Sequence, residues 1–202
     1  MSVRVISPPV PAVTPAEARV LAGLTGTDEI VEALIAAAQG SIDGPDGWLG
    51  RAIGKQTLEV APGWPMPLYS GGIALPCPPL VSIVSITYGA SLTLDPAAYA
   101  LGLDAVLRSV SSWPWGWGGW PGVKFRYVAG YVGQDGSQAT PAPIKEAISL
   151  MAKHKQLRAP RDPSLITDTV FGVGSQQFSA EPSTALMDDA KKLLEPYWVR
   201  TL

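Results

Sequence analysis

Side chains that could carry out catalysis or bind metal are scarce in this sequence. Its 202 residues include one histidine, His154, and one cysteine, Cys77. A Ser-His-Asp triad would have to use His154, but this residue lies between Lys153 and Lys155 and no nucleophile-elbow motif is present. One cysteine also excludes a cysteine-based zinc cluster. We therefore expect no catalytic residue, metal or cofactor, and we interpret His154 as a core-edge or surface histidine.

Two acidic pairs have the residue types of acid-base catalysis, Asp28-Glu29 and Asp188-Asp189. Each pair lies near a predicted helix N-terminus or on a polar helix face. There the helix dipole, or an ion pair of Asp188 with Lys192, explains it more simply. No phosphate-binding Gly-x-x-x-x-Gly-Lys-Ser/Thr loop occurs, and GWGGWPG does not match the dinucleotide fingerprint. The sequence thus predicts a protein that is not an enzyme.

A basic cluster surrounds the histidine. Its members are Lys153, Lys155, Arg158 and Arg161. These cations could contact DNA phosphates, but cations are also favoured at a helix C-terminus by the macrodipole. The formal net charge of -2 provides no general attraction for nucleic acid. A DNA-end or packaging factor therefore stays open as an alternative function, with these residues as possible DNA-channel contacts.

A glycine-rich loop holds four of the seven tryptophans, in the stretch SSWPWGWGGWPG. They are Trp113, Trp115, Trp117 and Trp120. An aromatic side chain buries about 150–250 Å², so four exposed indoles would approach or exceed the patch of roughly 300–600 Å² that a monomer normally shows. The protein's own sheet, another protein or a stacked ligand must cover them. The loop has few polar groups to orient a sugar, so a carbohydrate-binding module is the weaker alternative.

The segments that position these residues predict an α+β fold. The first 13 residues are interpreted as a loose or docking arm. Thr14 begins a helix as N-cap, with Pro15 at the first turn and Glu17 completing a capping box. GPDG at 44–47 ends a second helix, whose polar side includes Gln39. Its apolar side is predicted to comprise Ile30, Val31, Leu34, Ile35, Ala38 and Ile42.

From about residue 55 the apolar residues alternate, which predicts an antiparallel sheet of four to six strands. The expected strands are 55–62, 75–90, 97–102, 105–110 and 123–131. In the second of these, Val84, Ile86 and Tyr88 share a face while Val81 and Ile83 are in the opposite phase. Either both faces are covered at the start of this strand or a bulge occurs near Ile83.

Helical spacing returns over 141–159 and over 184–198. On the first helix an apolar stripe of Ile144, Ala147, Ile148 and Met151 opposes a polar face of Lys145, Glu146, Ser149 and Lys153. On the second the aligned residues are Leu186, Ala190, Leu193, Leu194 and Tyr197. Residues 158–182 between them show no clear helical or strand period. No apolar run reaches the length of about 18 residues that spans a membrane, so we expect a soluble protein without a membrane partner.

Several of these segments together resemble the head-to-tail connector, or adaptor, proteins of tailed bacteriophages and of phage-derived gene transfer agents. The similar stretches, spanning about residues 14–198, are VTPAEARVLAGLTGTDEIVEALIAAAQGSID, GWLGRAIGKQTLEV, IALPCPPLVSIVSITY, LDPAAYAL, VKFRYVAGY, PAPIKEAISLMAKH and LLEPYW. Each motif is short, and the resemblance rests on their order and spacing. It implies a helical connector scaffold with an inserted antiparallel β-sheet subdomain. The expected parts of this composite domain are an arm and helix pair at 1–54, the sheet with its tryptophan loop at 55–140, and helices with a docking arm at 141–202.

The resemblance also implies a structural role in a virion, assembled in the host cytoplasm. The expected partners are further copies in a ring, commonly a dodecamer, the portal protein, a stopper or tail connector, and DNA passing through the lumen. Candidate contacts with the portal or a neighbouring copy are Leu165, Ile166, Val170, Phe171, Phe178, Leu193, Leu194, Tyr197 and Trp198. The four loop tryptophans are candidate contacts with a neighbouring copy or the stopper.

Overall fold

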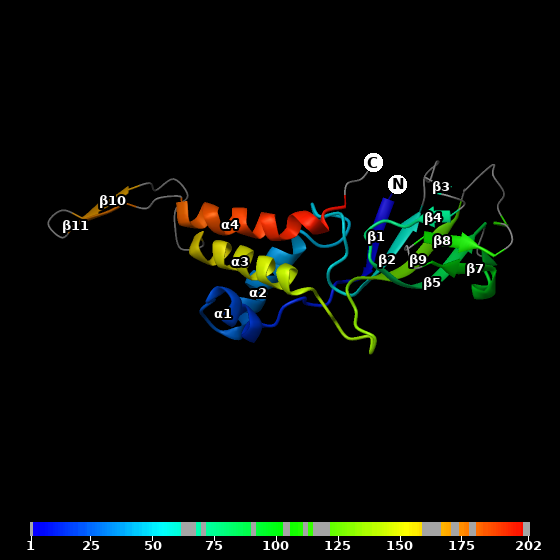
Figure 1. Cartoon of the computed structure of the whole chain (residues 1–202), viewed down its shortest axis with the longest axis horizontal. Helices are drawn as coiled ribbons and strands as arrows, with labels where there is room; N and C mark the ends of the chain where they lie inside the picture. The colour runs from blue at the N-terminus through cyan, green and yellow to red at the C-terminus, as the bar shows by residue number, and fades with distance from the viewer. Residues whose placement is uncertain are drawn as a thin grey trace. The chain divides into compact units, whose positions relative to one another are not determined.

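The computed structural model of the chain has an α+β fold (Figure 1). It describes residues 2–61, 68–69, 72–89, 92–102, 106–110, 113–114, 122–158, 167–170, 174–177 and 181–199. The chain divides into two compact units. The sheet unit comprises Met1–Val10, Ile42–Ala139 and Val199–Leu202, and the helical unit comprises Pro11–Ser41 and Thr140–Trp198.

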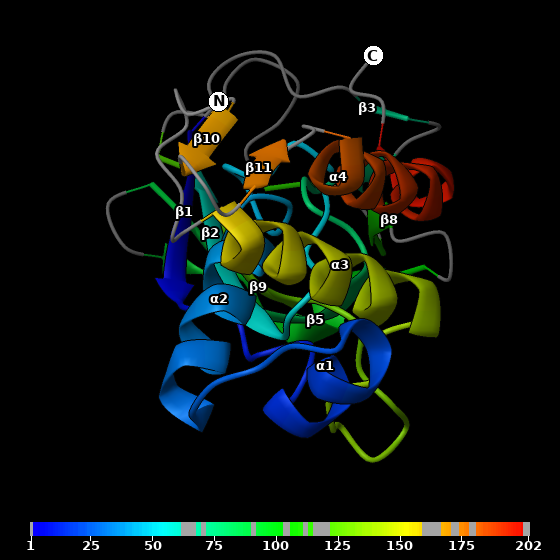
Figure 2. The ribbon, with the colours of Figure 1, turned by 90° about the vertical axis from the view of Figure 1, so that its left-hand side faces the viewer.

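The helical unit is built around its longest helix, α3. Its elements are α1 (Pro15–Ala22), α2 (Asp28–Gly40), α3 (Ala142–Arg158), α4 (Glu181–Leu194) and the 3-10 turn η2 (Glu195–Tyr197). Figure 2 shows α3 between α4 and the pair formed by α1 and α2, and α3 contacts all three helices. The predicted stripe of α3 is buried, with Ile144 and Ile148 fully enclosed. Since α3 is covered on several sides, it forms the core of this unit.

The predicted start of α1 is confirmed. The side chain of Thr14 accepts a hydrogen bond from the Glu17 backbone N–H, and the Glu17 carboxylate accepts one from the Thr14 N–H. This reciprocal pair satisfies two N–H groups that the helix leaves without partners. The helix ends at Gly23, whose φ of 61° lies in the left-handed region that glycine adopts readily.

Three side chains of the helical unit differ from the sequence prediction. Ile30 was placed on the apolar side of α2 but is 53% exposed. Gln39 was placed on the polar side but is buried, because its Oε1 accepts a hydrogen bond from the Ala12 N–H at 2.9 Å. Ser149 is also buried, and its hydroxyl donates to the Lys145 carbonyl one turn earlier on α3. Polar groups satisfied in this way can be buried at little cost.

The sheet unit contains two antiparallel sheets. The five-stranded sheet has the order β1-β2-β9-β5-β6 and the four-stranded sheet the order β3-β4-β8-β7. Their strands are β1 (Ser2–Ser7), β2 (Gln56–Ala61), β3 (Leu68–Tyr69), β4 (Gly72–Ala74), β5 (Leu80–Tyr88), β6 (Leu92–Thr93), β7 (Tyr99–Leu101), β8 (Val106–Ser109) and β9 (Lys124–Ala129), with the 3-10 turn η1 (Pro96–Ala98) before β7. Residues from both sheets share one core, including Phe125 and Tyr127 of β9 and Leu107 of β8.

The first strand corrects the prediction of a loose arm. Ser2–Ser7 pairs antiparallel with β2, placing Val3 opposite Val60 and Arg4 opposite Glu59. The prolines of this segment begin only at Pro8, after the strand has ended. Because proline has no backbone N–H to donate, it cannot continue the ladder of hydrogen bonds and the strand ends there.

Of the two alternatives for β5, the structure shows the bulge near Ile83, and this bulge changes which side chains share a face. The register of β5 against β9 shifts between Ile83 and Ser85, and again between Leu80 and Ser82. Val84 is therefore 53% exposed while Ile86 is buried, so the predicted common face for these two residues is wrong.

A short hairpin occupies part of the segment that showed no period. It consists of β10 (Thr167–Val170) paired antiparallel with β11 (Gly174–Gln177). The sequences TDTV and GSQQ lack alternating apolar residues, so the pattern of hydrophobicity could not indicate these strands. The candidate Val170 ends β10, whereas Leu165, Ile166, Phe171 and Phe178 lie outside the described residues.

Candidate functional site

The loop after α2 is fixed by one buried carboxylate. Asp43 Oδ1 accepts hydrogen bonds from the Ile53 N–H and from Gln56 Nε2, both at 2.7 Å. Its Oδ2 accepts a third from the Gly54 N–H at 3.0 Å. All three donors belong to the chain entering β2, so this carboxylate holds a loop closed. Such an arrangement is structural and presents no reactive group to a substrate.

The sheet unit also buries a thiol and a phenol. Tyr127 is enclosed, and its hydroxyl donates to the Pro76 carbonyl at 2.7 Å. Burial raises the pKa of the Tyr127 phenol, with a smaller contribution from Cys77. Burial also raises the pKa of the Cys77 thiol to about 11, reinforced by Asp43 and Asp46. A nucleophilic cysteine needs a lowered pKa, so both groups are neutral and unreactive near pH 7.

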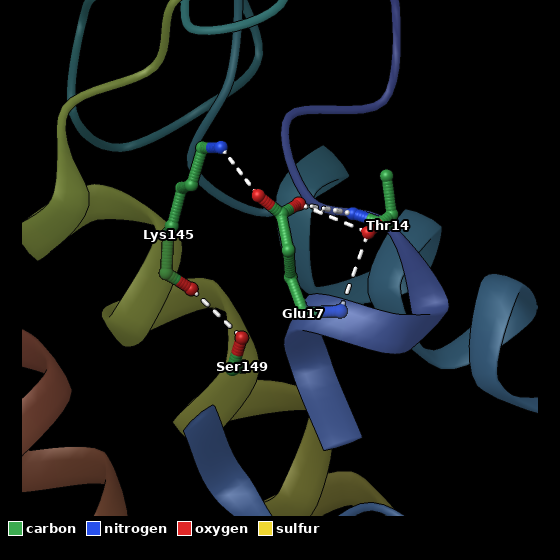
Figure 3. A network of polar contacts seen from close by, with 4 residues as sticks. All are labelled: Thr14, Glu17, Lys145 and Ser149. Carbon is green, nitrogen blue, oxygen red and sulfur yellow. Dashed lines mark hydrogen bonds and ion pairs between the residues drawn. The ribbon is translucent and has the colours of Figure 1, made fainter. Parts of the chain in front are cut away.

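In the helical unit a polar network joins α1 to α3 (Figure 3). Lys145 Nζ lies 2.7 Å from Glu17 Oε1, while the other Glu17 oxygen accepts from the backbone and hydroxyl of Thr14. The hydrogen bond from Lys145 is the largest cause that lowers the pKa of Glu17, followed by that from the Thr14 backbone. The Glu17 carboxylate thus caps the start of α1 and also forms an ion pair with α3.

The predicted basic cluster is used partly for structure. Lys153 Nζ donates to the Gly23 carbonyl at 2.8 Å and to Gln156 Oε1 at 3.2 Å. It therefore caps the C-terminal end of α1, as a cation at a helix C-terminus can. His154 is buried at 9% exposure, Lys155 is half-buried and Arg158 is exposed. Arg161 lies outside the described residues.

The acidic pairs take part in surface ion pairs. Asp28 Oδ1 lies 2.6 Å from Arg19 Nη2, which links the start of α2 to α1. Lys192 pairs with Asp189 at 3.2 Å, so the expected pairing with Asp188 is wrong. On α4, Lys192 thus pairs with the residue three positions before it and not with the residue four positions before it. Among the described residues, no group of three or more His, Cys, Asp and Glu side chains is placed to hold a metal.

The tryptophan loop joins β8 of one sheet to β9 of the other. Trp113, at its start, is half-buried and packs against the core shared by the sheets. Trp115, Trp117 and Trp120 lie outside the described residues. The alternatives of core packing and of an interface therefore stay predictions for these three.

The C-terminal candidates differ in exposure. Leu194 is fully buried and Leu193 is half-buried. Tyr197 is also half-buried, whereas Trp198 is 49% exposed. Of these four side chains, Trp198 offers the largest surface to a partner, and Leu194 belongs to the packing of the helical unit.

Both units expose apolar side chains that were not among the predicted interface residues. In the helical unit these include Val20, Leu21 and Ile30, with Val20 86% exposed. In the sheet unit they are Val5, Ile6, Val10, Trp48, Val84, Leu92 and Val110. Apolar periodicity marks residues that can be buried but not which of them the fold leaves outside, so only the structure separates the two sets.

In the part of the chain that the structure describes, no helix has both the length and the apolar character needed to cross a membrane. No protein-family model and no curated protein matches the sequence. Solved structures do match the fold.

One match is a chain of the virion of a native gene transfer agent particle, with a TM-score of 0.63 and 17% identity over 100% of this chain and 98% of that chain. Two others come from neck structures of such particles, one native and computed with C12 symmetry, one empty and computed with C6 symmetry. Each has a TM-score of 0.57 at the same identity and coverage. Because the likeness extends over nearly the whole of both chains, the two units together correspond to a fold found in these particles.

Proposed function

We propose that this protein is a structural component of the neck of a gene transfer agent or tailed-phage particle. Its role is that of a head-tail connector, or adaptor, in a ring below the portal. The ring extends the DNA channel and joins the head to the stopper or tail. The observation that carries this proposal is the full-length likeness to chains of gene transfer agent necks. A shared fold hosts many functions in general, so the proposal needs support from the surface as well.

The distribution of exposed apolar side chains supports a ring. Closed rings use heterologous contacts, in which one patch meets a different patch on the next copy. Each unit of this chain exposes its own apolar residues, such as Val20 on α1 and Val84 on β5. The C12 and C6 symmetries of the neck structures fit a dodecameric ring as the proposed assembly.

The described chemistry favours no other function. Cys77 and Tyr127 are buried in the core of the sheet unit. Their pKa values are raised, so both groups are neutral near pH 7. Lys153, the first cation of the proposed DNA-contacting cluster, is engaged with the end of α1. Fewer cations of this cluster are therefore available to contact DNA than the sequence suggested, which weakens the alternative of a DNA-end factor.

Electron microscopy of the purified chain tests the proposal. The chain is mixed with the portal protein of the same particle, and the complex is imaged and sized by sedimentation. We expect rings of this chain seated on the portal ring. A chain that stays monomeric and does not bind the portal under any condition contradicts the proposal.

We further propose that the β10–β11 hairpin and its flanking apolar residues contact the portal. Replacing residues 164–178 by a short Gly-Ser linker removes this segment but keeps α4, whose Ala190 and Leu194 are buried. The variant should retain its helical circular dichroism and lose portal binding. Unchanged portal binding would place the contact elsewhere.

The tryptophan loop is proposed to pack under the sheets or against an adjoining connector or stopper. The double variant Trp115→Ala, Trp117→Ala separates these cases. A lower melting temperature of the isolated monomer indicates core packing, and an unchanged monomer with impaired assembly indicates an interface.

A further inference from the structure

The outward side of α2 is formed by small residues. Ala33, Ala36, Ala37 and Gly40 are all exposed, and their spacing of i, i+3, i+4 and i+7 places them on one side of the helix. The opposite side holds Val31, Ile35, Ala38 and Gln39, which are buried within the helical unit. Exposed helix positions usually carry long polar side chains, so this surface is unusual for a face that remains in water.

Acidic and apolar residues border these small side chains. Glu29, Glu32 and Ile30 are exposed at the N-terminal half of α2, and the helix contains no lysine or arginine. We call this surface, comprising Glu29, Ile30, Glu32, Ala33, Ala36, Ala37 and Gly40, the α2 outer face. Alanine and glycine lose little side-chain entropy on contact and allow another backbone to approach closely. The face therefore suits close packing against a flat, basic surface.

The sheet unit has a surface of the opposite charge. On β9, Phe125 and Tyr127 face the core, so Lys124 and Arg126 project from the other side of the five-stranded sheet. The register places Arg4 opposite Glu59, and Glu59 opposite Arg126. Residues directly opposite each other project from the same face. Three cations thus accompany one carboxylate there, and Arg126 is the one that pairs with Glu59, at 2.6 Å.

The same surface contains an exposed apolar residue. The bulge in β5 leaves Val84 53% exposed. We call the surface formed by Arg4, Glu59, Val84, Lys124 and Arg126 the sheet outer face. The sheet outer face has a net positive charge and one exposed apolar residue, Val84. It therefore complements the α2 outer face, which has a net negative charge and Ile30 at its border.

We infer that the α2 outer face of one copy packs on the sheet outer face of the next copy. This inference rests on the proposed ring and identifies the two different patches that its heterologous contact needs. Packing a helix on a sheet covers the faces of both elements, as in α+β layers generally. Each contact is small and polar at its border, so a single contact is weak. Closure of the ring compensates for this weakness because every copy is held by two neighbours.

Charge reversal in two separate variants tests the pairing. The helix variant carries Glu29→Lys and Glu32→Lys, and the sheet variant carries Arg4→Glu and Lys124→Glu. In either variant alone both faces have the same sign, so the concentration for half-assembly should rise on the order of tenfold or more, since like charges oppose each other across the contact. A mixture of equal amounts restores opposite signs at every contact in a ring that alternates the two variants. Sedimentation velocity should therefore show rings in the mixture near the wild-type concentration.

A matched control reverses two exposed acidic residues outside both faces, Glu146→Lys and Asp188→Lys. This control should assemble like the wild type. Circular dichroism and the melting temperature of each monomer verify that the variants fold.

The outcomes separate this inference from the proposed function. Wild-type rings that neither variant weakens, or weakened variants that the mixture does not rescue, overturn the inference and leave the ring. DNA binding that the sheet variant loses while its rings persist also overturns it, because the sheet outer face would then serve a nucleic acid. A wild-type chain that never forms rings, with or without the portal, overturns both proposals.

Discussion

Asp43 shows how a single side chain can close a loop. Its two oxygens accept hydrogen bonds from two backbone N–H groups and one side-chain amide, and the residue is only 7% exposed. Gly44, the next residue, has a φ of 75°, and Gly47 lies where a Cβ would come within 2.3 Å of the Ile42 backbone carbonyl carbon. The carboxylate and the glycines are thus parts of one tight turn.

Replacing Asp43 should be costly. Asp43→Ala leaves three buried donors without their partner, and each unsatisfied group costs about 1–3 kcal/mol, so we expect a loss of roughly 3 kcal/mol or more. Urea unfolding followed by circular dichroism measures this. Asp46→Asn, at an exposed position in the same turn, should change the free energy of unfolding by less than about 0.5 kcal/mol. Equal effects of the two variants would contradict the structural role of Asp43.

Cys77 should be inert in the folded protein. Its pKa of about 11 leaves almost no thiolate at pH 8, and the side chain is buried. We expect a thiol reagent to label it slowly in buffer and rapidly in urea. The raised pKa also sets a direction for stability, since the unfolded chain ionises near pH 9 and the folded chain does not. Stability from this group is therefore lost as the pH rises above 9. Rapid labelling of the native protein would contradict this environment.

At the scale of elements, the link between α1 and α3 depends on pH. The Glu17 pKa is lowered, so its contribution to stability is present above the ordinary value of 4.5 and is lost as the pH falls through the lower folded value. Glu17→Gln keeps a side chain suited to the capping box but removes the ion pair with Lys145. Both partners are partly exposed, at 40% and 27%, so the pair contributes no more than about 1 kcal/mol.

This pH dependence is measured by comparing the melting temperatures of the wild type and Glu17→Gln. The wild type should be more stable at pH 6, and the difference should shrink as the pH falls below 4.5. Lys145→Met should show the same pattern. A difference that does not shrink on acidification would mean that the ion pair is not its source.

The elements also show what a sequence can predict. The start of α1 and the stripe of α3 follow from local rules, because a capping box and an apolar period depend on neighbouring residues only. The change of phase along β5 left a bulge as one of two alternatives, and the register against β9 decides between them. β1 and the hairpin were missed, since their strands are defined by a pairing partner and not by their own pattern. The burial of Gln39 was missed for a similar reason, as its partner Ala12 lies 27 residues away. The proposed interface faces depend on exposure and register, which only the folded chain provides.

At the scale of the whole molecule, each of the two units has its own buried core. A defect in one core should therefore affect mainly that unit. Ile148→Ala, at a fully buried position of α3, should cost about 2–5 kcal/mol within the helical unit. Hydrogen exchange read by mass spectrometry should show faster exchange in α2, α3 and α4, with little change in β2 and β9. Uniformly faster exchange would indicate that the two units unfold together.

The order of the units along the chain has a consequence for synthesis. Residues 42–139 of the sheet unit separate the two halves of the helical unit. The ribosome therefore completes α2 about 100 residues before the α3 on which α1 and α2 pack. At a synthesis rate of roughly 5–20 residues per second, the apolar faces of these two nascent helices remain exposed for about 5–20 seconds before α3 is synthesised. During translation the growing polypeptide would be a natural client for chaperones that shield exposed apolar segments.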